Sequence, residues 1–567
     1  MSLKRRDILI IGGTAFVPLA CGPAGTTAEP RGTPAAGTTA ATAATGATPA
    51  QQPRKGGVLR ASTLGGLPRV FHPYPEAQLN TTPHSDAWTL MGASLISIDW
   101  DKLDFRADPR TDLAREMPRI SNGGRTYTFT LRDNIKWSDG RPITAADFLF
   151  AWENARKPEN NWVALTSVVE RTESLTTPDE KTVELTLKQP LARLLGLTIA
   201  ASYSPMPKHI WEGKPWLDPG GNPEILMPTV VPGPYLPKEV NAELHRYARN
   251  PNWWGKETNL DEIVFLNGSV QTVLELLKTR QAEWAQSFPP AQFQEAKQIP
   301  HATVYDWTGG VASYRLMQFN LKRPNLSELQ FREALVRAIN RADLVQFEDD
   351  LAEPQFGLYP NKFSYASQAV ERFDYDLNRA KSLLQQAGYT LDGSVLKDKS
   401  GQPVKLEILW PTTSQPRGKM ATYAQQQWRQ LGIEVTVTGM EFNAFVDRYQ
   451  RQRDFDVVMG SFSQSSIDPD GIKSQYATNG SQNATGYSNQ RVDELLEQGA
   501  VEQDEQRRRQ IYDEIQKIAV AELPHFQMLS LKSFTAFDKN IQGVLPLKGG
   551  DILRQSNSQF MDWFSAV

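Results

Sequence analysis

The 567-residue chain contains a single cysteine, Cys21, so no disulfide within one copy can hold the fold together. A long apolar run is missing too, because the apolar stretch at residues 8–19 is too short to cross a bilayer. The formal net charge is only -3 and no basic stripe runs along the sequence, which argues against nucleic acid as a partner. We therefore expect a fold held by its apolar core and a partner that is a small solute or another protein.

Motifs for catalysis and metal binding are also missing. The six histidines show neither His-x-x-x-His nor His-Glu-x-x-His spacing, and there is no Gly-x-Ser-x-Gly motif. Scattered histidines and one cysteine offer no ligand cluster for zinc or haem. We expect no metal, no cofactor and no enzymatic activity. A secreted hydrolase, with a triad assembled from distant residues, is the least favoured alternative.

Residues 1–21 have the parts of a bacterial export signal. Basic residues at positions 4–6 precede the apolar run, and the segment 18–22 resembles a lipobox, with Pro18 where Leu or Val is usual. We therefore expect a lipoprotein signal peptide and a lipid on Cys21, which would anchor the protein to the cell membrane outside the cytoplasm. A plain signal peptide with an incidental thiol is the alternative.

The export route and the following linker can be described from composition. Residues 4–9 resemble a twin-arginine signal, so both the Sec and the twin-arginine exporters remain open. Residues 22–54 are rich in Ala, Thr, Gly and Pro and carry almost no large apolar side chain. Such a segment cannot offset the entropy of ordering its backbone, so we expect a disordered tether.

The second half of the chain alternates between strand and helix patterns. Residues 404–410 alternate as a half-buried strand does, residues 420–431 place apolar side chains on one helical face, and residues 433–437 form a second strand. A short helix at 442–449 then precedes a buried strand at 455–460. This βαβ order predicts a parallel sheet.

Helix caps can be predicted at two positions of the same half. Asp376 is placed to cap a helix with an apolar stripe at residues 380–387. Ser327 and Gln330 fit a capping box ahead of a second helix.

The first half is richer in strand patterns. Strands are expected at residues 57–63, 127–131 and 181–187, and Thr144 is expected to cap a helix that begins near Ala145.

Residues 127–152, YTFTLRDNIKWSDGRPITAADFLFAW, resemble the signature of the family 5 extracellular solute-binding proteins, which are the oligopeptide- and nickel-binding subunits of ATP-binding-cassette (ABC) importers. Much of this segment suits turns and helix packing, so we expect no ligand contact from Trp137 or Asp139. Further matching motifs follow in the family's order at 233–235, 250–254, 332–341, 380–389, 431–433 and 486–493.

The resemblance implies an α/β fold of the two-lobed type II periplasmic-binding-protein kind, with an extra subdomain inserted in the first lobe. Crossing strands are then expected near residues 308–320 and 523–529. The implied domains are lobe I at 55–310 with the insert roughly at 100–210, lobe II at 311–522, and a return to lobe I at 523–567.

The resemblance also implies a function. A solute would be enclosed between the lobes and delivered to an ABC permease, with no bond chemistry, by a protein expected to be a monomer. A solute sensor without a permease would have the same sequence features.

Open parallel sheets bind ligands beyond the carboxyl ends of their strands, which selects the candidate residues here. The ligand contacts predicted on this basis are Thr63, Trp284, Gln286, Trp410, Thr412, Phe462, Ser463, Ser465, Ser466 and Asp468. Trp307 and Tyr314 are added because they lie near an expected crossing between the lobes.

The loop at 460–468 bears on the class of solute. In peptide-binding members it resembles Gly-Trp-x-x-Asp, whose aspartate pairs with the amino terminus of the peptide. Aligned on Pro469, this chain has Ser465 there, and an enclosed ammonium without a carboxylate costs several kcal/mol. Asp468 could replace it only if the loop re-aimed the side chain, and a turn role is expected instead. An oligopeptide stays the first expectation, and a neutral oligosaccharide is the alternative.

Overall fold

The computed structural model describes residues 53–64, 67, 70–75, 82–160, 162, 164–165, 167–306, 313–464, 466–545 and 559–566. These residues belong to one unit of contacts, Gln52–Val567. The predictions for the leader, for Cys21 and for nearly all of the tether lie outside the described residues.

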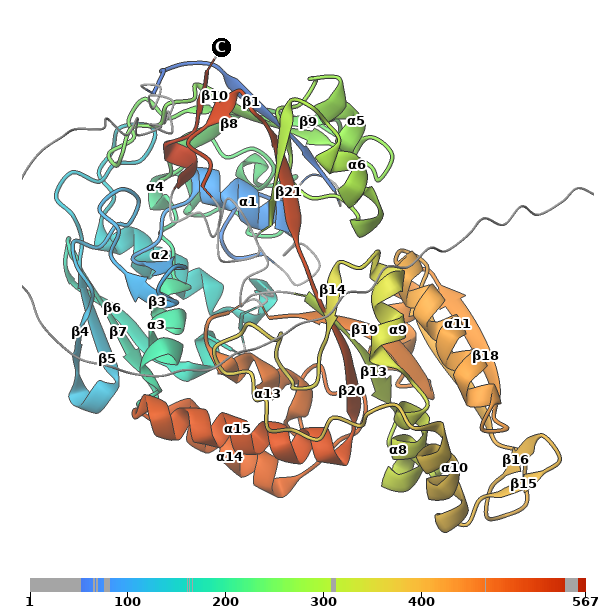
Figure 1. The fold of residues 1–567 in the computed structure, drawn as a ribbon. Helices are drawn as coiled ribbons and strands as arrows, with labels where there is room; N and C mark the ends of the chain where they lie inside the picture. Colours follow the sequence, from blue (N-terminus) through green and yellow to red (C-terminus); the bar gives the residue numbers. More distant parts are fainter. Residues whose placement is uncertain are drawn as a thin grey trace, which may run out of the picture. The chain divides into compact units, whose positions relative to one another are not determined.

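A seven-stranded mixed sheet forms the centre of the first lobe (Figure 1). Strand β1 runs parallel to β10 and β11, and its Leu59 and Ala61 enter the core on the face that α1 covers. Helices α5 and α6 bury their apolar side chains in a separate cluster with Ala285 and Ala536. In sheet order the strands are β12 (Ala302–Asp306), β21 (Phe534–Asp538), β11 (Trp284–Ala285), β1 (Val58–Thr63), β10 (Glu262–Asn267), β9 (Leu244–Arg249) and β8 (Tyr235–Val240).

A six-stranded mixed sheet forms the centre of the second lobe. The predicted parallel arrangement is confirmed for β17, β18 and β19, whereas β13, β20 and β14 pair antiparallel. Along β19, Val457 and Met459 join the core on one face while Val458 joins that on the other. The strand order is β14 (Ala352–Pro354), β20 (His525–Leu531), β13 (Ser313–Phe319), β19 (Val457–Ser463), β17 (Lys405–Pro411) and β18 (Glu434–Met440).

An inserted subdomain within the first lobe is built on a four-stranded antiparallel sheet. Its strands are β4 (Arg119–Ser121), β5 (Thr126–Thr130), β7 (Thr182–Leu187) and β6 (Thr172–Asp179). Thr144 precedes α2 as predicted, and its backbone N–H donates to Asp147 Oδ2 (3.0 Å) in a capping box. Trp137 is buried and donates to the same carboxylate (3.4 Å), so this part of the family signature is structural.

The helices pack on the faces of these sheets. In the first lobe and its insert they are α1 (Thr82–Met91), α2 (Ala145–Ala155), α3 (Arg193–Ala201), α4 (Lys208–Trp211), α5 (Val273–Lys278) and α6 (Phe293–Lys297). In the second lobe they are α7 (Pro324–Ser327), α8 (Leu329–Arg337), α9 (Arg341–Val345), α10 (Leu377–Gln386), α11 (Gln415–Arg429), α12 (Phe442–Val446), α13 (Lys473–Tyr476), α14 (Gln490–Val501) and α15 (Glu505–Glu522). Short two-stranded ribbons pair β2 (Ser97–Asp99) with β3 (Asp104–Arg106), β15 (Thr390–Asp392) with β16 (Val395–Lys397), and β22 (Ile541–Gln542) with β23 (Phe564–Ser565).

Two predicted helix caps and one predicted crossing can be compared with the structure. Asp376 caps α10 as predicted, since its Oδ1 accepts the N–H of Arg379 (2.8 Å). The capping box at Ser327 is wrong, because Ser327 ends the short helix α7 and its hydroxyl donates to the Pro324 carbonyl (2.7 Å). The second crossing lies at residues 532–533, later than the predicted 523–529, because all of β20 pairs within the second sheet.

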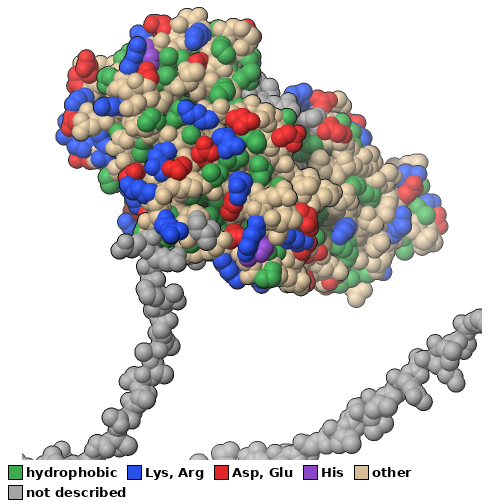
Figure 2. Space-filling view, turned by 90° about the horizontal axis from the view of Figure 1, so that it is seen from above, with side chains coloured by type: hydrophobic (Ala, Val, Ile, Leu, Met, Phe, Trp, Pro, Cys, Tyr) green, Lys and Arg blue, Asp and Glu red, His purple; other side chains and the backbone are tan. Residues whose placement is uncertain are grey.

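Charge is distributed without a dominant sign on the face shown in Figure 2, where basic and acidic side chains are interspersed. Many of the described charges form ion pairs across short distances, such as Arg246 with Glu262 (2.7 Å). Within the part of the chain that the structure describes, no helix is both long enough and apolar enough to span a membrane.

Candidate functional site

The two lobes are joined by two crossings that leave the first sheet at one point. Asp306, the end of β12, pairs with Phe534, the start of β21. On the second sheet, Tyr314 at the start of β13 pairs with Ser530 near the end of β20. The crossing at 532–533 is so short that Leu531 and Phe534 are at most about 11 Å apart.

This connection brings two particular sheet edges toward each other. In the first sheet, β21 starts beside the carboxyl ends of β1 and β11, because it pairs antiparallel to β11. In the second sheet, β13 starts beside the carboxyl end of β19, with Ser313 opposite Ser463. The edges expected to bind ligand are therefore the edges that the crossings link.

The edge of the second sheet gathers three of the predicted residues. Tyr314 and Phe462 lie opposite each other on β13 and β19, with their rings 6.3 Å apart. Ser463 is exposed, and its hydroxyl lies 2.7 Å from that of Ser313. Tyr314 itself is buried and donates to Gln475 Oε1 (3.2 Å), so Phe462 and Ser463 are the more accessible pair.

A group of charged side chains lies just behind this edge. Arg315 donates to Glu348 Oε1 (2.7 Å) and to Ser461 Oγ (2.7 Å). Arg417, in the first turn of α11, is half-buried, and its Nε has no hydrogen-bond partner among the described residues. Burial, followed by the charge of Arg315, lowers the pKa of Arg417 to about 10. Glu348 is thus paired with Arg315, and for Arg417 its charge raises the pKa by less than burial lowers it.

Trp410 and Thr412 lie at the end of β17, the next strand of that edge. Trp410 is half-buried between Gly418 and Gly439, and a Cβ at Gly418 would come within 2.7 Å of its indole. It lines a groove of about 730 Å³ along α11 together with Phe347, Lys419 and Tyr423. Thr412 is exposed and donates to the Met440 carbonyl (3.2 Å).

The predicted residues of the first sheet are much less accessible. Trp284 has no exposed surface; its indole stacks on Phe537 at 5.0 Å and its N–H donates to Thr535 Oγ1 (2.7 Å). Thr63 is buried and donates to the Leu266 carbonyl (3.4 Å). Gln286 is buried and its amide donates to Asp86 of α1. In this conformation Trp284 is part of the core.

Asp468 is committed to the protein interior. Its carboxylate accepts two hydrogen bonds from Arg508, at 2.7 and 3.0 Å, and both side chains are at most 3% exposed. Oδ1 also caps the turn at Pro469 by accepting the N–H of Asp470 (2.9 Å), as expected of a turn residue. Ser466 accepts the N–H of Asp468 (3.1 Å). Two other predicted contacts, Trp307 and Ser465, lie outside the described residues.

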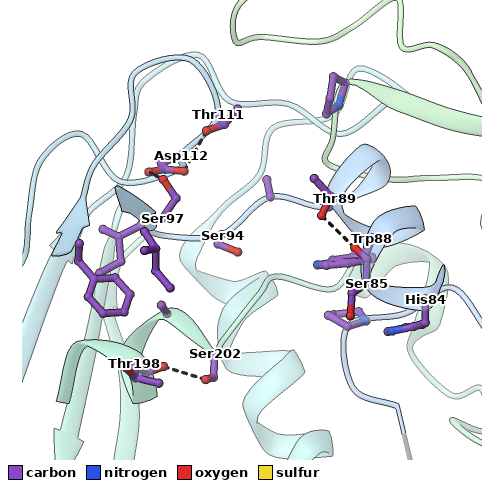
Figure 3. A pocket seen from close by; sticks show the side chains of 18 of the residues that line it. His84, Ser85, Trp88, Thr89, Ser94, Ser97, Thr111, Asp112, Thr198 and Ser202 are labelled. Atoms are coloured by element: carbon purple, nitrogen blue, oxygen red, sulfur yellow. Dashed lines mark hydrogen bonds between the residues drawn. The ribbon is translucent and has the colours of Figure 1, made fainter. Parts of the chain in front are cut away.

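A separate cavity of about 510 Å³ lies within the first lobe, between α1 and the inserted subdomain (Figure 3). One wall is α1, which contributes Ser85, Trp88 and Thr89, and Gly92 leaves room for the Trp88 ring, since a Cβ there would be 2.3 Å away. The opposite wall carries Ser97, Thr111 and Asp112, and the end of α3 closes the floor with Thr198 and Ser202.

Asp112 is the carboxyl group of this cavity. It is 2% exposed and accepts hydrogen bonds from Ser97 Oγ (2.8 Å), Thr111 Oγ1 (3.1 Å) and the N–H of Asp108 (2.6 Å). Burial, the largest cause, raises the pKa of Asp112 to about 7. Across the cavity, His84 Nε2–H donates to the His72 carbonyl (3.0 Å), and burial lowers the pKa of His84, which favours the neutral ring.

The residues selected from the sequence do not line this cavity. The helical spacing of Ser85, Trp88 and Thr89, which puts two hydroxyls and an indole on one face of α1, is the signal that could have indicated it. Within the described residues no group of three His, Cys, Asp or Glu side chains is placed to hold a metal ion.

Comparisons with known proteins agree with this geometry. The family model of the bacterial extracellular solute-binding proteins, family 5, matches residues 108–484. The chain is 26% identical over 439 residues to the periplasmic murein peptide-binding protein MppA of Escherichia coli, covering 71% of this chain and 76% of that one. It is 24% identical over 486 residues to the oligopeptide-binding protein OppA of Bacillus subtilis, covering 80% of this chain and 85% of that one.

Solved structures show the same fold. The oligopeptide-binding protein AppA of Bacillus subtilis, in complex with a nonapeptide, superimposes with a TM-score of 0.74 at 20% identity, covering 91% of this chain and all of that one. The periplasmic EDTA-binding protein EppA gives a TM-score of 0.80 at 20% identity, covering 91% and 98% of the two chains. The chain therefore belongs to family 5 of the bacterial extracellular solute-binding proteins, and it is a binding protein, not an enzyme.

Proposed function

We propose that this protein captures an oligopeptide between its two lobes and delivers it to an ABC importer in the membrane. The observation that carries the proposal is the pairing of the two crossings, which join the carboxyl-end edges of the two sheets. A hinge at this place lets the edges close on a solute. The printed names of relatives, which describe binding of murein peptide and oligopeptide, favour a peptide as that solute.

Closure follows from contacts that exist only when both lobes touch the solute. A ligand shifts the equilibrium between open and closed forms only by its difference in affinity for them. Moving the population from 1:99 to 99:1 takes roughly 5.5 kcal/mol. Phe462 and Ser463 from the second lobe, with groups of the first lobe, would supply those contacts.

The commitment of Asp468 to Arg508 keeps a second solute class open. With this carboxylate engaged inside the protein, it is not available to pair with the amino terminus of a peptide. A peptide would need another partner for its ammonium group, whereas a neutral oligosaccharide would need none. The same fold binding an oligosaccharide is therefore the alternative, and a sensor without a permease is a further one.

We also propose that a lipid on Cys21 anchors the protein outside the cytoplasm and that residues 22–54 act as the tether. The family description, which names extracellular proteins, supports the compartment. The sequence around Cys21 supports the anchor.

A thermal-shift screen of the purified protein against separate peptide and oligosaccharide libraries tests the function. A ligand that binds only the native state raises Tm. At a ligand concentration of one hundred times Kd, the free energy of unfolding increases by about 2.7 kcal/mol. Stabilisation by peptides supports the proposal, and stabilisation by sugars alone replaces it with the alternative. A protein stabilised by neither class would contradict solute capture of either kind.

A further inference from the structure

Five of the hydroxyl groups that line the cavity in the first lobe donate their protons to groups of the protein. Thr89 donates to the Ser85 carbonyl (2.9 Å), Thr198 to the Leu194 carbonyl (2.8 Å) and Ser202 to the Thr198 carbonyl (2.8 Å). On the opposite wall, Ser97 and Thr111 donate to Asp112. A hydroxyl has one proton and two lone pairs, so a hydroxyl whose proton is already engaged can meet a ligand only as an acceptor.

The charge of the cavity also favours a ligand group that donates hydrogen bonds and carries positive charge. Among the described residues that line it there is no Lys or Arg, and Asp112 is the one carboxylic acid. The lining also includes Trp88, Trp100, Phe105 and Trp162. Aromatic rings attract a cation through their quadrupole, and Asp112 attracts it through its charge once its carboxyl group is ionised, which a bound cation favours.

We propose that this cavity binds a protonated amine or guanidinium group of the ligand, such as the side chain of a Lys or Arg residue in a captured peptide. The inference rests on the proposed function and adds the class of peptide to it. The volume of the cavity, about 510 Å³, exceeds what one such side chain needs, so part of the peptide backbone would enter as well. An anionic group is disfavoured, because the described lining residues offer it no cation.

Calorimetric titration with pentapeptides Ala-Ala-X-Ala-Ala, and with the same peptides carrying X at the other positions, tests the proposal. X is Lys, Arg, norleucine or Glu, and norleucine matches the lysine stem without its charge. We expect a Lys or Arg peptide to bind at least tenfold tighter than its norleucine counterpart, and Glu peptides to bind most weakly. Equal or tighter binding of norleucine peptides at every position would overturn the proposal while leaving peptide capture intact.

The Asp112→Asn variant, which keeps the shape of the side chain, should lose the preference for Lys over norleucine and keep its affinity for the norleucine peptide. The matched control is Asp139→Asn, a carboxylate on the surface of the insert that pairs with His209 (2.9 Å) and should keep the preference. An unchanged preference in Asp112→Asn contradicts the role of this carboxyl group.

A second variant tests the proposal in case Asp112→Asn does not fold. Ala201→Phe adds bulk at the cavity wall and leaves the carboxyl group unchanged. It should lower the affinity for the Lys peptide at least tenfold. Full affinity of this variant, with an unchanged Tm, would place the ligand elsewhere. If no peptide binds the unmodified protein while oligosaccharides do, the peptide proposal itself fails and this inference falls with it.

Discussion

Whether a single side chain of this protein is accessible to a ligand depends on the partners that surround it in the fold. Trp284 and Asp468 were both predicted ligand contacts from their place near strand ends, but Trp284 stacks on Phe537 and Asp468 pairs with Arg508. Strand ends can be predicted from the local sequence, but a long-range partner cannot. The partner of Asp468 lies 40 residues away. Phe462 and Ser463, from the same reasoning, do lie at an accessible edge.

The buried pair of Asp468 and Arg508 leads to a stability prediction. Asp468→Ala leaves the guanidinium of Arg508 buried without its partner, so we expect the free energy of unfolding to fall by about 3–5 kcal/mol. Asp447→Ala, which removes an exposed ion pair with Arg451, is the matched control and should change it by less than about 1 kcal/mol. Denaturant unfolding measures both, and equal effects would refute the structural role of Asp468.

Because Asp112 is buried, we predict that the stability of the protein depends on pH. Because burial raises its folded pKa to about 7, above the unfolded value, its contribution to stability is present below the unfolded pKa and is lost as pH rises toward 7. The charge of Asp108 raises the pKa of Asp112, and the charge of Asp112 raises the pKa of Arg110 in turn.

The matching measurement is denaturant unfolding of the unmodified protein and Asp112→Asn at several pH values. Between pH 4 and pH 7 the stability of the unmodified protein should fall relative to the variant by up to about 4 kcal/mol. A difference independent of pH would show that Asp112 titrates as an ordinary exposed carboxyl group.

Elements with strong local patterns could be predicted from the sequence, and their partners in space could not. The strands at β17, β18 and β19 and the cap of α10 follow from alternation and from a single Asp, which are local signals. Strands near β13 and β20 were expected as crossing strands, but their antiparallel pairing in the second sheet was not predicted, because they are about 200 residues apart and pairing at that distance leaves no periodic signal. The cavity was missed for the same reason, since its walls come from separate segments.

Helix α11 illustrates a competition between propensity and packing. Alanine is a better helix former than glycine by about 1 kcal/mol, but a Cβ at Gly418 would lie 2.7 Å from the indole of Trp410. We expect Gly418→Ala to lower the free energy of unfolding by about 1–3 kcal/mol and to change the Trp fluorescence, because the indole must move.

Gly471→Ala is the control for that substitution. A Cβ there meets no atom within 4 Å, so its effect should stay within about 0.5 kcal/mol. A stabilised Gly418→Ala protein with unchanged fluorescence would mean that Trp410 is not held between the two glycines.

The insert and the second lobe are also in contact outside the hinge. Arg171 of the insert pairs with Asp470 (2.9 Å), and the backbone N–H of Ala192 donates to the Ala500 carbonyl (2.7 Å). Ile467 and Ala500 bury their side chains in the core of the insert. When the lobes move about the hinge, either these contacts break or the insert moves together with the second lobe.

For the whole molecule, the anchor is open to a direct test. If Cys21 carries the lipid, Cys21→Ser should move the protein from the membrane fraction to the soluble extracytoplasmic fraction and should leave ligand affinity unchanged. Fractionation followed by mass spectrometry of the amino-terminal peptide measures both. A Cys21→Ser protein that stays in the membrane fraction would contradict the anchor.

The central claim, capture of a solute between two closing lobes, is tested most directly by a distance between the lobes. Spin labels at Glu243 of the first lobe and Arg429 of the second, in a Cys21→Ser background, report this distance by pulsed electron resonance. The matched pair Glu243 and Val270 lies within the first lobe. A saturating peptide should shorten the first distance and leave the second unchanged. A saturating peptide that leaves the distance between the lobes unchanged would contradict capture by closure.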